Sequence, residues 1–196
     1  CEPSVAINNE GKFVISWYNL SDNNIYAKLF ENNGISTVRD FRVNLSAEGE
    51  NGLPQVAMDK TGNFVITWQK TSEDGSVFGV FARKYGSTGS PTGPEFRVNS
   101  ETNNPYDQYE PAIAMNSNGN FVITWQNLNQ NFKGESGIFA QKFSNAGNKV
   151  GTEFLVKTYS GIEETDPSAA IDSNNNFVIA WANAGIHAKI FDNKKF

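Results

Sequence analysis

The sequence predicts an all-β fold, a four-bladed β-propeller of four-stranded blades, and three observations support this. A motif recurs four times, 51 to 57 residues apart, and ends each time at a tryptophan: Trp17, Trp68, Trp125 and Trp181. Each copy holds several short strand-like runs, which is typical of a propeller blade. Aromatic residues make up 13% of the chain, enough for a substantial core. Half of a larger propeller is the alternative architecture.

Each copy begins with two strands joined by a tight turn. The first opens at a proline, as in segment 111–115, and the second carries the tryptophan, as in 121–125. The period-2 pattern of a strand places Phe64, Ile66 and Trp68 on one face. In the first strand small residues lie opposite Val56 and Met58, which suits the crowded axis of a propeller. We therefore expect the first strand to be innermost and the tryptophans to fill the gaps between blades.

A third and a fourth strand complete each copy except the last. The third occurs at 25–30, 80–85, 138–143 and 186–191, and the fourth at 40–44, 95–99 and 153–157. The predicted single domain thus spans 1–196, with blades at about 3–44, 54–99, 111–157 and 167–191. The last blade lacks its outer strand. Its open edge at 186–191 fits a truncated chain, a genuine three-stranded blade, or a site where a strand of another chain docks in self-association.

The segment 119–158, together with 107–115, resembles a tandem repeat of about 50 residues that is common in large secreted or surface-displayed bacterial proteins of the adhesin type. The likeness lies in a glycine turn, a second strand ending in tryptophan, an aromatic third strand and a final Glu-Phe strand. It extends to all four copies. The resemblance implies an extracellular or cell-surface location and a binding or display role, an inference from fold-level analogy.

Composition narrows the class of partner. The formal net charge of −5 argues against binding to a nucleic-acid backbone or to an anionic membrane surface. No apolar run approaches the length that spans a bilayer. The single cysteine, Cys1, excludes an internal disulfide. It fits either the lipid-carrying first residue of a bacterial lipoprotein or a processing boundary.

Acidic residues concentrate on the rim where the first strands begin and the second strands end. A carboxylate lies four residues before three of the strand-opening prolines, at Glu50, Asp107 and Glu163. Another lies directly before the proline at Glu110 and Asp166, as does Glu2 in the first copy. The five candidates Glu50, Asp107, Glu163, Glu110 and Asp166 could bind Ca²⁺, which accepts many oxygen ligands in irregular geometry. A solvated rim that keeps the protein soluble is the other interpretation.

Aromatic residues in the loops of the same rim suggest a glycan or a protein as the ligand. Tyr106, Tyr109, Phe132 and Tyr159 have Asn, Asp or Gln neighbours, so rings could stack on sugar faces while amides bind hydroxyls. The same rings could instead fold back over the core.

The sequence shows no familiar catalytic group. His187 is the only histidine and takes the place of Tyr26, Phe81 and Phe139, which indicates a packed ring. Turns that begin with Asp59 or Asp172 have too few carboxylates for a calcium loop, so we expect these aspartates to bond their own turns. We therefore expect a non-catalytic binding or display module. The alternatives are a structural subunit that self-associates and, less favoured, a glycoside hydrolase using two rim carboxylates.

Overall fold

The computed structural model describes residues 2–46, 49–71, 78–100, 107–128, 137–158 and 164–193. These residues form fifteen strands in four antiparallel sheets. Within them, no helix is long and apolar enough to cross a membrane. The all-β prediction is confirmed.

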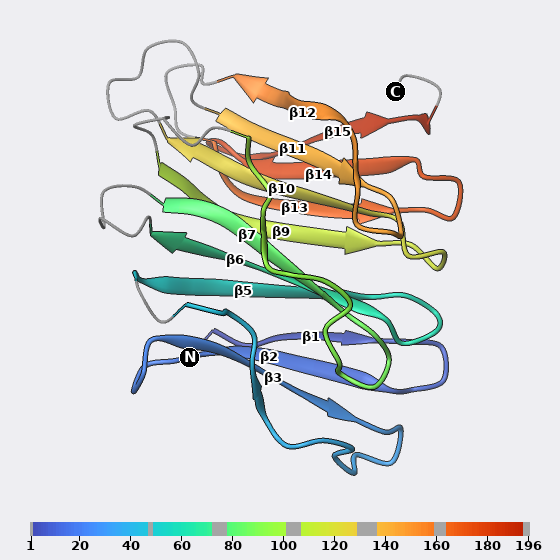
Figure 1. Cartoon of the computed structure of the whole chain (residues 1–196). Helices are drawn as coiled ribbons and strands as arrows, with labels where there is room; N and C mark the ends of the chain where they lie inside the picture. The colour runs from blue at the N-terminus through green and yellow to red at the C-terminus, as the bar shows by residue number, and fades with distance from the viewer. Residues whose placement is uncertain are drawn as a thin grey trace.

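Each sheet corresponds to one copy of the repeat (Figure 1). The first holds β1 (Ser4–Ile7), β2 (Phe13–Asn19), β3 (Asn24–Phe30) and β4 (Phe41–Arg42). The second holds β5 (Asn51–Met58), β6 (Phe64–Thr71), β7 (Phe78–Tyr85) and β8 (Phe96–Arg97). The third holds β9 (Asp107–Met115), β10 (Phe121–Leu128), β11 (Gly137–Phe143) and β12 (Lys149–Thr158). The fourth holds only β13 (Thr165–Ile171), β14 (Phe177–Ala182) and β15 (Ile186–Phe191), so the predicted lack of an outer strand is confirmed.

The strands of every sheet follow chain order, and the first strand is innermost, as predicted. Strand β5 packs against both β1 and β9, and β9 packs against β13. The four sheets therefore succeed one another as propeller blades, from the N-terminal blade at the bottom of Figure 1 to the third and fourth blades, which overlap in the upper part of the view.

Neighbouring blades pack two different faces together. We call the side that carries Phe64, Ile66 and Trp68 in the second blade its aromatic face, and the side that carries Val65, Val80 and Ala82 its aliphatic face. The aromatic face of each later blade packs on the aliphatic face of the blade before it. Trp68, Trp125 and Trp181 are buried in these interfaces, so the prediction that they fill the gaps between blades is confirmed.

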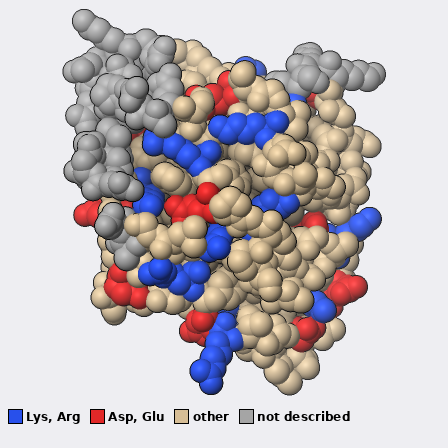
Figure 2. Space-filling view, in the orientation of Figure 1, with Lys and Arg blue, Asp and Glu red and all other residues tan. Residues whose placement is uncertain are grey.

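Carboxylates of the outer strands add polar links between blades. The side chain of Glu95 accepts a hydrogen bond from the backbone N–H of Leu45 at 2.8 Å, and that of Glu153 accepts one from Ser100 at 2.7 Å. Glu95 also pairs with the buried Lys70 at 3.6 Å. On the face shown in Figure 2, acidic and basic side chains are mixed.

The two ends of the array are open. In a closed ring the aromatic face of the first blade would meet the aliphatic face of the fourth. Instead Val5 and Ile7 are 64% and 65% exposed on the first blade, and Ile186 and Ile190 are 82% and 79% exposed on the fourth. The blades thus form an open fan, the arrangement expected of part of a larger propeller. Trp17 is only half-buried for the same reason.

Candidate active site

The residue before the strand-opening proline has the same unusual backbone in three blades. Leu53, Glu110 and Asp166 have φ values of 50°, 50° and 51°. This left-handed region is uncommon for residues other than glycine. Non-glycine residues held there often belong to functional sites, where the surrounding structure compensates for the strain.

A β-bulge explains this backbone. In each of these blades the pre-proline residue and the proline together oppose the single tryptophan of the next strand, and the strand register shifts there. Proline has no N–H to donate to the ladder, so a bulge is one of the few places in a sheet that accepts it. Bulges also redirect side chains. The repeated proline therefore places three equivalent side chains in a line across neighbouring blades.

Oxygen atoms from neighbouring blades hold these bulges in place. The carboxylate of Glu2 accepts a hydrogen bond from the backbone N–H of Leu53 at 2.8 Å. The carboxylate of Glu110 accepts one from the N–H of Asp166 at 2.9 Å. The N–H of Glu110 donates to the side-chain oxygen of Gln69 at 3.2 Å. Glu110 is thus held from both sides: its backbone N–H bonds to the second blade, and its carboxylate bonds to the fourth blade.

A cavity of about 310 Å³ lies over this line of bulges, between the second, third and fourth blades. Its lining consists of the bulged segments and the strand residues after them: Leu53, Gln55, Glu110, Pro111, Ala112, Asp166, Pro167 and Ser168. Glu110 is half-buried and Asp166 is exposed. The lining has two carboxylates and no lysine or arginine. Such a pair, in a cleft open to solvent, can exchange protons with a bound substrate and with water.

The structure brings together only some of the residues predicted from sequence. Glu110 and Asp166, predicted as metal ligands, share the cavity. Asp107 is buried and accepts a hydrogen bond from the N–H of Phe78 at 2.9 Å. Glu50 is exposed, and its backbone N–H donates to the hydroxyl of Thr71. Glu163 lies outside the described residues.

The calcium hypothesis stays a prediction. Among the residues that the structure describes, no three carboxylate, histidine or cysteine side chains lie close enough to hold a metal ion together. One carboxylate oxygen of Asp107 accepts a hydrogen bond from the backbone of the second blade. Of the predicted ligands, only Glu110 and Asp166 share a cavity in the part of the chain that the structure describes.

The predicted aromatic ligand site is represented by one residue. Three of the four predicted aromatic residues lie outside the described residues: Tyr106, Phe132 and Tyr159. Cys1 lies outside them as well. Tyr109 packs its ring against Phe78 at 5.2 Å. Burial raises the pKa of Tyr109 to about 12, and the hydrogen bond to Asp107 acts in the same direction. The ring of Tyr109 therefore packs between the second and third blades. This contact agrees with the alternative that the loop aromatic rings fold back over the core.

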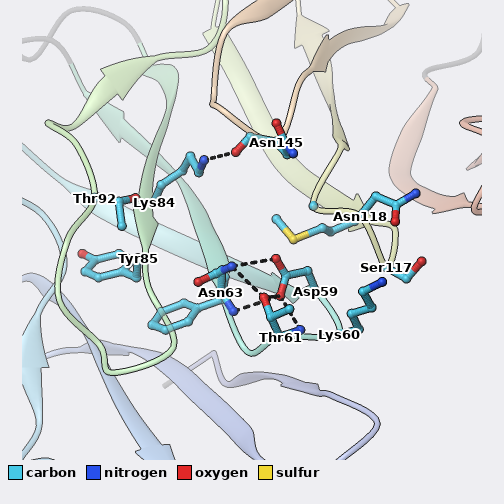
Figure 3. A pocket seen from close by; sticks show the side chains of 13 residues that line it. Asp59, Lys60, Thr61, Asn63, Lys84, Tyr85, Thr92, Ser117, Asn118 and Asn145 are labelled. Carbon is cyan, nitrogen blue, oxygen red and sulfur yellow. Dashed lines mark hydrogen bonds between the residues drawn. The ribbon is translucent and has the colours of Figure 1, made fainter.

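A larger cavity, of about 470 Å³, lies on the opposite rim between the second and third blades (Figure 3). Asp59 lies on its floor but is fully engaged by its own turn. It accepts hydrogen bonds from the backbone N–H groups of Thr61 and Asn63, at 2.8 and 3.0 Å, and from both of their side chains.

Burial alone would raise the pKa of Asp59, but these hydrogen bonds outweigh it and hold the pKa below its usual value. Lys84, above it in Figure 3, donates to the backbone oxygen of Asn145. The same turn bonding occurs at Asp172, where Asn174 and Asn176 donate. The expected turn chemistry is confirmed, and this cavity has no free carboxylate to offer a substrate.

The ring of His187 stacks on Trp181 at a centroid distance of 6.0 Å. The equivalent pairs are Trp17 with Tyr26 and Trp125 with Phe139, at 6.1 and 6.3 Å. The predicted stacking of His187 is present, but the side chain is exposed, so the packed-ring interpretation is confirmed only for the contact with Trp181.

Neither family models nor curated proteins match the sequence. Among solved structures, an α-L-arabinofuranosidase of Fusarium graminearum is similar over 92% of this chain and 55% of its own, with 12% identity and a TM-score of 0.63. A Bacteroides thetaiotaomicron endo-arabinase is similar over 97% of this chain and 73% of its own, with 13% identity and a TM-score of 0.57. A sialidase named Hadza microbial sialidase Hz136 is similar over 98% and 44%, with 10% identity and a TM-score of 0.66.

These similarities establish the propeller fold, and the chain spans about half the length of the first of these structures. They also correct the functional prediction. The expectation of a non-catalytic binding or display module, and of a protein that is no enzyme, is wrong, because the similar structures are glycan-cleaving enzymes. The prediction rested on the lack of a familiar catalytic group in the sequence. The repeat itself places carboxylates at adjacent bulges.

Proposed function

We propose that this chain carries the active site of a β-propeller glycoside hydrolase, with Glu110 and Asp166 as its carboxylate pair. The observation that supports the proposal is the pair of strained acidic bulges on adjacent blades, which face one solvent-open cavity. The similarity to arabinan- and sialoside-cleaving enzymes supports the reaction class. A glycan is therefore the proposed partner. The secreted or cell-surface location that the bacterial repeat implies is consistent with a polymeric glycan as the substrate.

Most glycoside hydrolases use one carboxylic acid that protonates the departing oxygen and one carboxylate that acts as base or nucleophile. One oxygen of Glu110 is held by the N–H of Asp166, so its carboxylate has a fixed orientation and a second oxygen for chemistry. Asp166 is exposed and accepts a hydrogen bond from the hydroxyl of Thr165 at 2.9 Å. We assign Glu110 as the base or nucleophile and Asp166 as the proton donor.

The test is an assay of the chain against arabinan, β-1,3-galactan, a sialoside and the matching aryl glycosides. One substrate should be cleaved, and Glu110→Gln and Asp166→Asn should each lower kcat by ~10²–10⁴-fold. Azide should restore turnover to a Glu110→Ala variant, where the shortened side chain leaves room for the anion in place of the carboxylate, but only if the assignment of roles is right. No cleavage of any of these substrates, or full activity in both variants, would overturn the proposal.

Two control variants separate chemistry from folding. Glu110→Leu places at the third bulge the residue that the second blade carries in the same backbone conformation, so it should fold and be inactive. Glu10→Gln changes an exposed carboxylate on the opposite rim and should leave kcat unchanged.

A further inference from the structure

One long uncharged polar side chain reaches the cavity over the bulges from the innermost strands. Four equivalent residues directly follow the strand-opening prolines and pair with the second strand in the same register: Ser4, Gln55, Ala112 and Ser168. Three of them are small, as suits strands that crowd around a propeller axis. The second blade instead carries a glutamine, and this glutamine lines the cavity that holds the proposed carboxylate pair.

The first blade fixes the orientation of the Gln55 amide. The hydroxyl of Ser4 accepts a hydrogen bond from the backbone N–H of Val56 at 3.2 Å and donates one to the side-chain oxygen of Gln55 at 3.3 Å. The amide oxygen is therefore engaged, whereas the amide nitrogen has two N–H groups and no partner among the described residues. Because Gln55 is half-buried in the cavity wall, this nitrogen is available to donate a hydrogen bond to a ligand.

The other walls of the cavity suit an uncharged sugar. Leu53, Pro111 and Pro167 offer apolar surface to the C–H groups of a sugar ring. Ligand sites commonly combine such walls with a few polar groups that fix orientation, and the volume of about 310 Å³ lies at the small end of their range. The carboxylates of Glu110 and Asp166 would repel an acidic sugar, and no lysine or arginine of the described lining offsets them.

We infer that Gln55 binds the sugar beside the carboxylate pair, with its amide nitrogen donating to a hydroxyl of an uncharged sugar ring. Leu53 contacts the ring from the same blade. The substrate class is then a neutral glycan rather than one that presents a sialic or uronic acid at this position. The inference rests on the proposed function, because the sugar it describes is the one that the carboxylate pair would cleave.

The test is isothermal titration calorimetry of the full chain with three sugars: arabinobiose, β-1,3-galactobiose and 3′-sialyllactose. Each protein sample carries Glu110→Gln, so that the sugars are not consumed during the titration. The glutamine keeps an oxygen that can accept from the N–H of Asp166, so the bulge should be retained. We expect at least one of the two neutral disaccharides to bind and the sialylated sugar to bind more weakly.

Gln55→Ser, added to the same protein, removes the amide. It should fold normally, because serine already occupies this position in the first and fourth blades. The Kd of the neutral disaccharide should rise about 10-fold, as expected for one lost hydrogen bond. Ser4→Ala removes only the group that orients the amide and should raise the Kd by about 2–3-fold.

Asn118→Ser is the matched control. It makes the same change from amide to hydroxyl at an exposed residue of the larger cavity on the opposite rim, and it should leave the Kd unchanged. Circular dichroism and the melting temperature of each variant verify that the fold is intact.

Four results would overturn the inference: no binding of either neutral disaccharide, tighter binding of sialyllactose, an unchanged Kd in Gln55→Ser, or an equal rise in Asn118→Ser. The proposed hydrolysis fails differently. Binding that depends on Gln55, without cleavage of any glycan, would support the sugar site and overturn the hydrolysis. Cleavage that depends on Glu110, with a Kd that is insensitive to Gln55→Ser, would overturn the sugar contact alone.

Discussion

The interior and end blades carry the same side chains in different surroundings. Trp125, inside the fan, is 1% exposed and donates its indole N–H to Gln108 at 2.6 Å. Trp17, in the first blade, occupies the equivalent position and is only half-buried. Both stack on the aromatic residue of the next strand at nearly the same distance. The local structure of a blade is therefore determined by its own repeat, while the contribution of each side chain to folding stability depends on the neighbouring blade that covers it.

The largest expected difference concerns the tryptophans. Trp125→Ala should destabilise the protein by ~3–5 kcal/mol, because it opens a cavity between two blades. Trp17→Ala should cost about 1 kcal/mol, because solvent already reaches the ring. Urea unfolding of both variants under dilute, monomeric conditions measures the difference. Equal losses would show that the first blade is covered in solution even when dilute.

The isoleucines of the third strands provide a second pair. Ile138→Ala should cost ~2–5 kcal/mol, because the side chain is fully buried between the third and fourth blades. Ile186→Ala should lie within about 0.5 kcal/mol of the wild type when dilute, as is usual for exposed positions. Thermal unfolding at two concentrations sharpens the comparison, since the loss at position 186 should grow if the fourth blade acquires a partner.

A smaller effect is expected at the turns. Asp59→Ala removes hydrogen bonds to a buried carboxylate and should cost about 1–3 kcal/mol. Asp172→Ala changes the same turn in the fourth blade, where the carboxylate is exposed, and should cost less. Chemical denaturation at neutral pH gives both values. A larger loss at Asp172 would contradict the view that interior turns contribute more.

The pH dependence of stability should reflect the same aspartate. The folded-state pKa of Asp59 lies below the ordinary value of 3.8, so its contribution is complete above that pH and is lost as the pH falls through the folded pKa. Asp59→Asn should reduce the loss of melting temperature below about pH 4. It should fold normally, because Asn8 and Asn116 take this position in the first and third blades. An unchanged acid transition would assign the effect to other carboxylates.

The sequence predicted the architecture well because the repeat encodes it locally. Alternation within 64–68 placed Trp68 in an interface, and the break in the fourth copy located the missing outer strand. The acidic residues before Pro111 and Pro167 were also recognised. Their strained backbone was not predicted, because a bulge and a left-handed backbone are not visible in residue spacing. The signal that could have revealed them is a proline inside an otherwise regular strand, which cannot join the ladder without a bulge.

The sequence by itself determined the number of blades, their strand order and the residues that form their two faces, because each of these depends on short-range periodicity repeated four times. Only the tertiary structure decided which acidic side chains share a cavity and which apolar faces stay uncovered. Both depend on contacts between residues about 50 positions apart, such as the carboxylate of Glu110 on the backbone of Asp166. Contacts of this range are set by how the blades stack, and no local pattern specifies them.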